Sequence, residues 1–261
     1  MLKVSPNVKF SYNLVKGSIS QRKVFVSSLN EKLFEQLQPI VTKDMPIRKF
    51  KSIYNKTLPE KKKIEIKTLK ESKDFEGASD YLYDSRDYIN GMTLEIPAQR
   101  SKILKDALVT VMHENTHILD TLSNPKHTVL TQKLYREGKY DNKRDNWFLK
   151  VLYNEERPNS DKEAVLDDVK EKTRNFLKGK SNSDKILLLQ DARYQLEQEQ
   201  HAYFEQLKYA KKIKDMGEEV SENDLTDCEP LYMFTEKIQL LKEMAFDLIS
   251  QERKKISKKY K

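Results

Sequence analysis

Hydrophobic and polar residues alternate most regularly between residues 61 and 97. The stretch KKKIEIKTL at Lys61–Leu69 alternates with a period of two, which predicts a strand with one buried face. The stretch YLYDSRDYINGMTLEIP at Tyr81–Pro97 carries two more strand-like runs around Asn90 and Gly91, a residue pair typical of tight hairpin turns. We therefore expect a small sheet in the N-terminal part of the chain.

From Gln99 onward the apolar residues follow a helical period. Between Ile103 and Leu122 they recur at spacings of three, four and seven, which places them on one face of a helix. The residues of this face are Leu104, Ala107, Leu108, Val111, Ile118 and Leu122. The pattern predicts a packed helix over residues 99–123.

Three further helices are predicted after residue 160. The first two each begin at a serine cap and end at a glycine, the residue favoured just past a helix C-terminus. The predicted helices are 161–178 (capping box of Ser160 and Glu163, stop at Gly179), 183–216 (cap at Ser183, stop at Gly217) and 230–258.

The predicted helix 99–123 carries the sequence HENTH, which uses two of the four histidines in the chain. His113 and His117 are four residues apart, so both imidazoles lie on one face of the helix and could bind one zinc ion. Glu114 follows the first histidine and would point beside the ion, where a carboxylate can transfer protons. Asp120 is placed to accept a hydrogen bond from a ligand imidazole. The alternative is a chance string of exposed residues.

A third ligand is expected from the stretch DARYQLEQEQHAYFEQ at Asp191–Gln206. Helical periodicity places Glu199 on the same apolar stripe as Leu196 and Tyr203, where a positive ion would offset the cost of burying a carboxylate. An ion pair with a lysine or arginine is the alternative for Glu199. The same periodicity predicts that Glu197 and His201 form a solvated pair on another face.

Composition limits the other function classes. The chain has a net charge of +8, but basic and acidic residues are interleaved, as on an ordinary solvated surface, and no nucleic-acid motif is present. The single cysteine, Cys228, excludes an intramolecular disulfide and a thiolate zinc cluster. Neither a signal peptide nor an 18-residue apolar run is seen, so we expect synthesis in the cytoplasm and no membrane partner.

HENTHILD at residues 113–120 and the later EQHA at residues 199–202 resemble the gluzincin-type zincin metallopeptidases. They are similar in particular to the catalytic domain of anthrax lethal factor and related bacterial toxin and effector proteases. The resemblance implies a zinc endopeptidase in which His113, His117 and Glu199 bind Zn²⁺ and Glu114 is the general base acting on a zinc-activated water.

The resemblance also implies that the substrate, an extended protein or peptide segment, lies along an edge strand. Here this strand would be Met92–Ile96, with its free backbone groups binding the peptide. A tyrosine or histidine would stabilise the oxyanion, and Tyr194 and Tyr203 are the nearest candidates. A role as an effector would imply export by a leaderless route into a host cell.

We thus predict one α+β, mainly α, zincin-like domain over residues 1–261. Residues 1–98 would hold the small sheet and N-terminal elements, 99–123 the active-site helix, and 160–258 the helical part with the third ligand. A zinc-binding protein without catalysis, or a basic helical interaction protein that binds nucleic acid and no metal, remain alternatives. The sequence does not indicate the oligomeric state.

Overall fold

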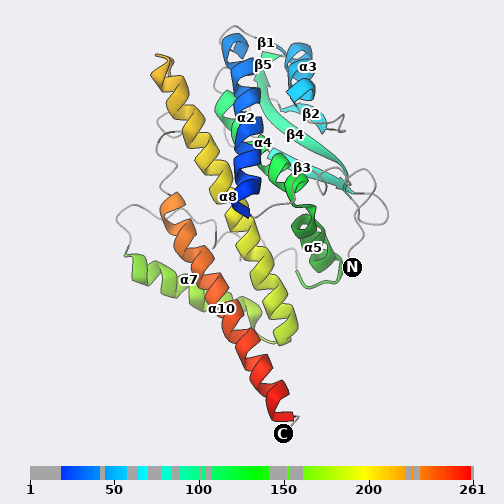
Figure 1. Ribbon diagram of the computed structural model, residues 1–261, viewed down its shortest axis with the longest axis vertical. Helices are drawn as coiled ribbons and strands as arrows, with labels where there is room; N and C mark the ends of the chain where they lie inside the picture. The colour runs from blue at the N-terminus through cyan, green and yellow to red at the C-terminus, as the bar shows by residue number, and fades with distance from the viewer. Residues whose placement is uncertain are drawn as a thin grey trace. The chain divides into compact units, whose positions relative to one another are not determined.

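The computed structural model describes residues 19–41, 45–57, 64–69, 78–83, 89–99, 102–103, 107–140, 152, 161–220, 225 and 230–259 (Figure 1). The chain divides into two compact units: unit 1 comprises Met1–Val129 and His201–Thr226, and unit 2 comprises Leu130–Gln200 and Asp227–Lys261. Helix α8 (Asn182–Asp215) runs unbroken from unit 2 into unit 1. The described residues are mainly helical with one small sheet, as expected for an α+β protein, and a single folding domain stays a prediction.

Strand β4 (Ile89–Gln99) is the centre of the sheet in unit 1. Strand β2 (Ile64–Leu69) pairs with it in parallel, and β3 (Ala78–Tyr83) pairs with it antiparallel on the opposite side. Two short strands, β5 (Lys102–Ile103) and β1 (Met45–Pro46), continue from its C-terminal end. The alternation that predicted β2 is confirmed, because Ile64 and Ile66 are buried.

The prediction that Met92–Ile96 is an edge strand is wrong. Met92 pairs with Ile64 of β2 on one side and with Tyr81 of β3 on the other. The backbone groups of this segment are therefore used within the sheet. Among the described residues, β3 pairs with β4 alone and is an edge of the sheet.

The predicted turn at Asn90 and Gly91 is also wrong, since both residues lie within β4. Strands β3 and β4 do pair antiparallel, but Leu82 pairs with Gly91 whereas Tyr83 pairs with Ile89. Asn90 is therefore an extra residue in the ladder, which is a β-bulge. The chain that joins the two strands lies outside the described residues.

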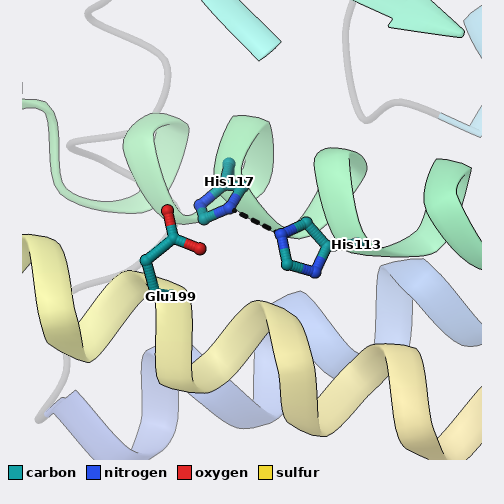
Figure 2. Close-up of side chains that lie close together, drawn as sticks. All are labelled: His113, His117 and Glu199. Atoms are coloured by element: carbon teal, nitrogen blue, oxygen red, sulfur yellow. Dashed lines mark hydrogen bonds between the residues drawn. The ribbon is translucent and has the colours of Figure 1, made fainter. Parts of the chain in front are cut away.

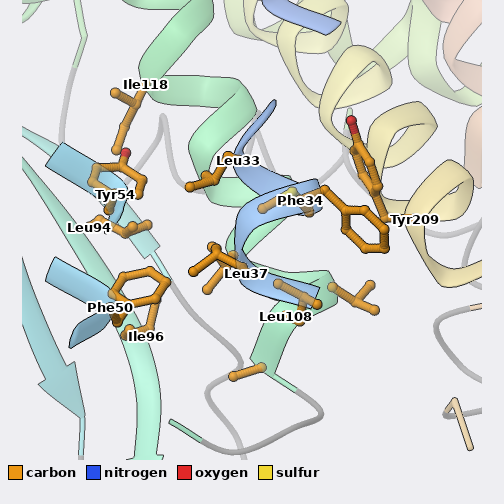
Figure 3. Close-up of a cluster of buried hydrophobic side chains, with 14 of the residues drawn as sticks. Leu33, Phe34, Leu37, Phe50, Tyr54, Leu94, Ile96, Leu108, Ile118 and Tyr209 are labelled. Carbon is orange, nitrogen blue, oxygen red and sulfur yellow. The ribbon is translucent and has the colours of Figure 1, made fainter. Parts of the chain in front are cut away.

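Three helices complete the described N-terminal part of unit 1. They are α2 (Ile19–Val41), α3 (Ile47–Thr57) and α4 (Ala107–Ser123), and the first two were not predicted from the sequence. Helix α4 contacts strands β3 and β4 as well as α2, so it lies between α2 and the sheet. The shared core includes Leu33, Phe34, Leu37, Phe50, Tyr54, Leu94, Ile96, Leu108, Ile118 and Tyr209 (Figure 3).

Helix α4 begins later than its sequence pattern predicts. The apolar period favoured a helix from Gln99, but Gln99 pairs with Lys102 and Ala98 pairs with Ile103 in the sheet. Strand pairing therefore overrides the helical pattern there. Leu104, which the apolar stripe included, lies outside the described residues.

Unit 2 contains α7 (Lys162–Leu177), α10 (Pro230–Lys259), the first part of α8 and most of α5 (Pro125–Arg136). The predicted glycine stops are confirmed, because Gly179 and Gly217 adopt positive φ angles of 80° and 78°. The predicted caps differ by a residue or two. Asp161 caps α7, and Ser181 accepts a hydrogen bond at the start of α8. No described helix combines the length and apolar character that a membrane span requires.

Asp191 anchors the first part of α8 within unit 2. Its fully buried carboxyl group accepts hydrogen bonds from Thr131 (2.5 Å), Tyr140 (2.6 Å) and Gln195 (2.8 Å). Burial raises the pKa of Asp191, although these hydrogen bonds act in the opposite direction. The three donors satisfy a polar group that would otherwise destabilise the core.

We predict that Leu94→Ala destabilises the fold by about 3 kcal/mol, because it leaves a cavity where a fully buried side chain of the central strand packed. The free energy of unfolding can be measured by denaturant titration with circular dichroism. Val24→Ala is the control, since Val24 is 71% exposed and its truncation should change stability by less than about 0.5 kcal/mol. Equal effects of the two substitutions would contradict the core assignment.

Candidate metal centre

The two histidines of HENTH lie one turn apart on α4, and their rings are in contact. His117 is buried and His113 is partly exposed. The Nε2 atoms of the two rings are 3.2 Å apart, and the ring planes meet edge to face with centroids 4.9 Å apart (Figure 2). The predicted spacing of four residues therefore does bring both imidazoles to one point.

Glu199 on α8 completes this group. One ligand atom each from His113, His117 and Glu199 lies within 4.8 Å of the other two, and the Glu199 carboxylate points towards the imidazoles (Figure 2). Glu199 stands two residues before His201 on the unbroken helix α8. The group could hold a metal ion, as predicted.

The separation of the two nitrogens agrees with shared binding of one ion. Metal–nitrogen bonds of about 2.0–2.1 Å at a tetrahedral angle place two nitrogen ligands about 3.3 Å apart. The observed 3.2 Å is close to this value. In the absence of a metal the same distance is a hydrogen bond, in which one ring donates to the other.

Gln206 selects the tautomer of His113. Nδ1 of His113 donates a hydrogen bond of 2.8 Å to Oε1 of Gln206, so in the neutral ring the proton is on Nδ1 and the lone pair is on Nε2. This is the tautomer that a metal ligand needs. Gln206 is buried and lies 93 residues from His113, and no local sequence signal points to the pairing.

Tyr203 packs against His113, the same candidate ligand. Its ring meets the His113 ring edge to face with centroids 4.8 Å apart. The apolar stripe that the sequence predicted on α8 thus does carry both Glu199 and Tyr203 to the side of α8 that meets the histidines.

The prediction of a solvated pair between Glu197 and His201 is wrong for His201. This histidine is only 5% exposed, and its Nδ1 donates a 2.8 Å hydrogen bond to Oδ2 of Asp120. Glu197 forms an ion pair with Arg193 one turn earlier on α8. Asp120 was expected to accept from a ligand imidazole, but the partner that the structure shows is His201. The Asp120–His201 bond links α4 to α8 close to the ligands.

The remaining predicted residues stand on the same two helices. Glu114 directly follows His113 on α4 and is partly exposed. Tyr194 is buried on α8, five residues before Glu199. Its role in oxyanion binding stays a prediction, and Tyr203 is the tyrosine that contacts a candidate ligand, His113.

Comparison of the chain with protein-family models, with curated proteins and with solved structures finds no match. The assignment of a function therefore depends on the geometry of the site and on the resemblance of its motif.

We predict that Gln206→Leu weakens metal binding by about 10- to 100-fold, because the His113 ring loses the acceptor that fixes its tautomer. Gln206→Glu should keep the affinity or raise it, since a carboxylate also accepts from Nδ1. Affinity can be measured by competition with a chromophoric chelator.

The matched control is Gln200→Leu on the same helix. Gln200 donates an exposed hydrogen bond to Thr235 and not to a histidine. Its metal affinity should equal that of the unmodified protein. If Gln206→Leu and Gln200→Leu bind metal equally well, Gln206 does not support the ligand.

Proposed function

We propose that this protein is a zinc-dependent metalloendopeptidase. The observation that carries the proposal is the convergence of His113, His117 and Glu199, with Glu114 directly after the first histidine on the same helix. Two imidazoles and one carboxylate are a donor set that zinc uses in catalytic sites, with a fourth position left for water or substrate. The resemblance of HENTH and the later glutamate to gluzincin-type peptidases supports the same assignment.

The protein residues divide the chemistry between them. When bound, zinc would supply a Lewis acid that polarises the peptide carbonyl and lowers the pKa of water. Glu114 would take a proton from the attacking water and return it to the leaving amine of the peptide. Glu114 is partly exposed, so its carboxylate is accessible to a substrate that binds from solvent.

The position of Tyr203 favours it as the residue that steadies the substrate oxyanion. Its ring contacts a proposed ligand, and a phenol can donate a hydrogen bond to an oxygen that develops negative charge. Tyr194 is the other candidate. Substituting each tyrosine by phenylalanine would distinguish them, since only the active one would lower turnover and leave metal binding intact.

An extended substrate would bind along β3, which replaces Met92–Ile96 as the candidate strand. Strand β3 is an edge strand among the described residues and lies against α4. The unpaired backbone groups of such an edge can add a further strand. A host-cell protein as substrate, and thus a role as toxin or effector, is proposed from the motif resemblance alone.

We predict about one zinc per chain in the purified protein, and we expect Glu199→Gln to lose it under a mild chelator challenge. The amide is a much weaker ligand than the carboxylate it replaces. Glu197→Gln is the control, because Glu197 pairs with Arg193 and should leave the zinc content unchanged. Metal analysis of the three proteins decides the assignment. Retention of zinc by Glu199→Gln and its loss by Glu197→Gln would assign the ligand to Glu197.

Glu114→Gln should keep zinc and the fold but lower turnover by about 10²- to 10⁴-fold, since it removes the proton acceptor and no ligand. Cleavage can be followed by mapping new N-termini in a proteome incubated with the protein, with the zinc content of the variant as control. If neither protein cleaves any substrate while both hold zinc, the protein binds zinc without catalysis. Loss of zinc from Glu114→Gln would instead make Glu114 a ligand.

A further inference from the structure

The two residues between Glu114 and His117 are buried and face away from solvent. Asn115 is 2% exposed and Thr116 is fully buried. Asn115 Nδ2 donates to Oδ1 of Asn30 (2.7 Å), and Thr116 Oγ1 accepts from Nδ2 of Asn30 (2.8 Å). The Asn30 side chain of α2 is therefore hydrogen-bonded to both residues that separate Glu114 from His117.

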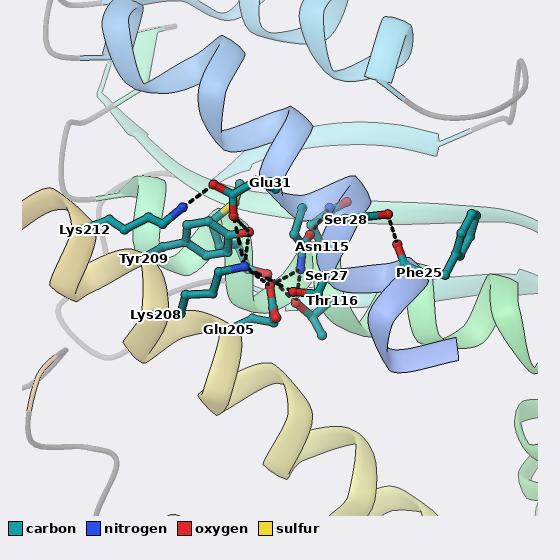
Figure 4. Close-up of polar contacts among 12 residues, drawn as sticks. Phe25, Ser27, Ser28, Glu31, Asn115, Thr116, Glu205, Lys208, Tyr209 and Lys212 are labelled. Carbon is teal, nitrogen blue, oxygen red and sulfur yellow. Dashed lines mark hydrogen bonds and ion pairs between the residues drawn. The ribbon is translucent and has the colours of Figure 1, made fainter. Parts of the chain in front are cut away.

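Asn30 also reaches α8. Its Nδ2 donates a second hydrogen bond to Oε2 of Glu205 (3.2 Å), so this fully buried amide connects α2, α4 and α8. Figure 4 shows Asn115 and Thr116 on α4 together with Glu205 on α8. Glu205 directly precedes Gln206, the acceptor of His113, and Thr116 directly precedes His117.

A fourth element completes the arrangement. The Tyr54 hydroxyl of α3 donates to Oδ1 of Asn115 (2.6 Å), and burial raises the pKa of Tyr54, so the hydroxyl keeps its proton. Thr116 Oγ1 donates in turn to the carbonyl of Met112 on its own helix. Each donor in this set has an acceptor, so the group is satisfied within the core.

We propose that Asn30 is a positioning residue for the metal centre, an inference that rests on the proposed zinc site. Metal ligands must be held to within about 0.5 Å of their bonding geometry. Apolar side chains alone would let α4 slide or rotate against α8, whereas directional hydrogen bonds favour one arrangement. Asn30 thereby sets the rotation of α4 that points both histidines at Glu199.

The test exchanges the amide of Asn30 and the carboxylate of Glu205 between the two positions. Asn30→Asp removes the donor and places a second carboxylate beside Glu205, and it should weaken zinc binding by about tenfold or more. The double variant Asn30→Asp/Glu205→Gln restores a donor–acceptor pair at the same place. Its affinity should return to within about threefold of the unmodified protein, because coupled residues show non-additive effects.

The absorption spectrum of the cobalt-substituted protein gives the second measurement. Cobalt bands depend on the geometry of the ligands, so Asn30→Asp should shift them and the double variant should restore them. Lys212→Met is the matched control, because Lys212 joins α8 to α2 through an ion pair with Glu31 and not through Asn30. Its spectrum and zinc affinity should be unchanged.

The outcomes separate this inference from the proposed function. If the unmodified protein binds no metal, the zinc site itself is wrong. If it binds zinc and Asn30→Asp shows the same affinity and cobalt spectrum, the positioning role is overturned while the zinc site stands. Should Asn30→Asp not fold, Thr116→Val removes one Asn30 bond with little change in volume, and unchanged affinity and cobalt spectrum in that variant overturn the role equally.

Discussion

Helix α4 is buried around almost its whole circumference, and the arrangement of unit 1 follows from this constraint. Its apolar residues pack against β3, β4 and α2, but the helix also carries Asn115, Thr116 and His117 into the interior. A buried polar group without a partner costs about 1–3 kcal/mol. Partners therefore have to come from the surrounding helices. Asn30 of α2 is hydrogen-bonded to both Asn115 and Thr116, and Tyr54 of α3 donates to Asn115. Asn30 in turn donates to Glu205 of α8.

The polar contacts between these helices differ between the buried interior and the surface. The buried contacts between α2, α4 and α8 use amides and hydroxyls around Asn30, together with Glu205. Glu31, the residue after Asn30 on α2, is paired with Lys208 and Lys212 of α8 where solvent is near (Figure 4). Burial raises the pKa of Glu31, but hydrogen bonds from the two lysines outweigh this and hold it below its usual value. The contact between α2 and α8 thus has ion pairs at its solvent-exposed edge and uses hydrogen bonds in its interior.

The candidate metal centre lies beside this contact between α4 and α8. Hydrogen bonds from His113 to Gln206 and from His201 to Asp120 link α4 and α8 at this candidate site. Zinc held by Glu199 of α8 and the two histidines of α4 would join the two helices, so metal binding and the packing of the two helices would stabilise each other.

Local sequence features determined those parts of this protein that depend on neighbours along the chain. The alternation at β2, the glycine stops at Gly179 and Gly217, the histidine spacing on α4 and the phase of Glu199 all follow from the geometry of one strand or helix. Contacts between distant segments decided the rest. Strand β4 is central because it pairs with another strand on each side, and Asn90 lies in a bulge of this pairing. His201 is hydrogen-bonded to Asp120, which is 81 residues away in the sequence. The partners of Asn30 lie 85 to 175 residues away, and periodicity within one element cannot indicate which distant side chain will satisfy a buried polar group.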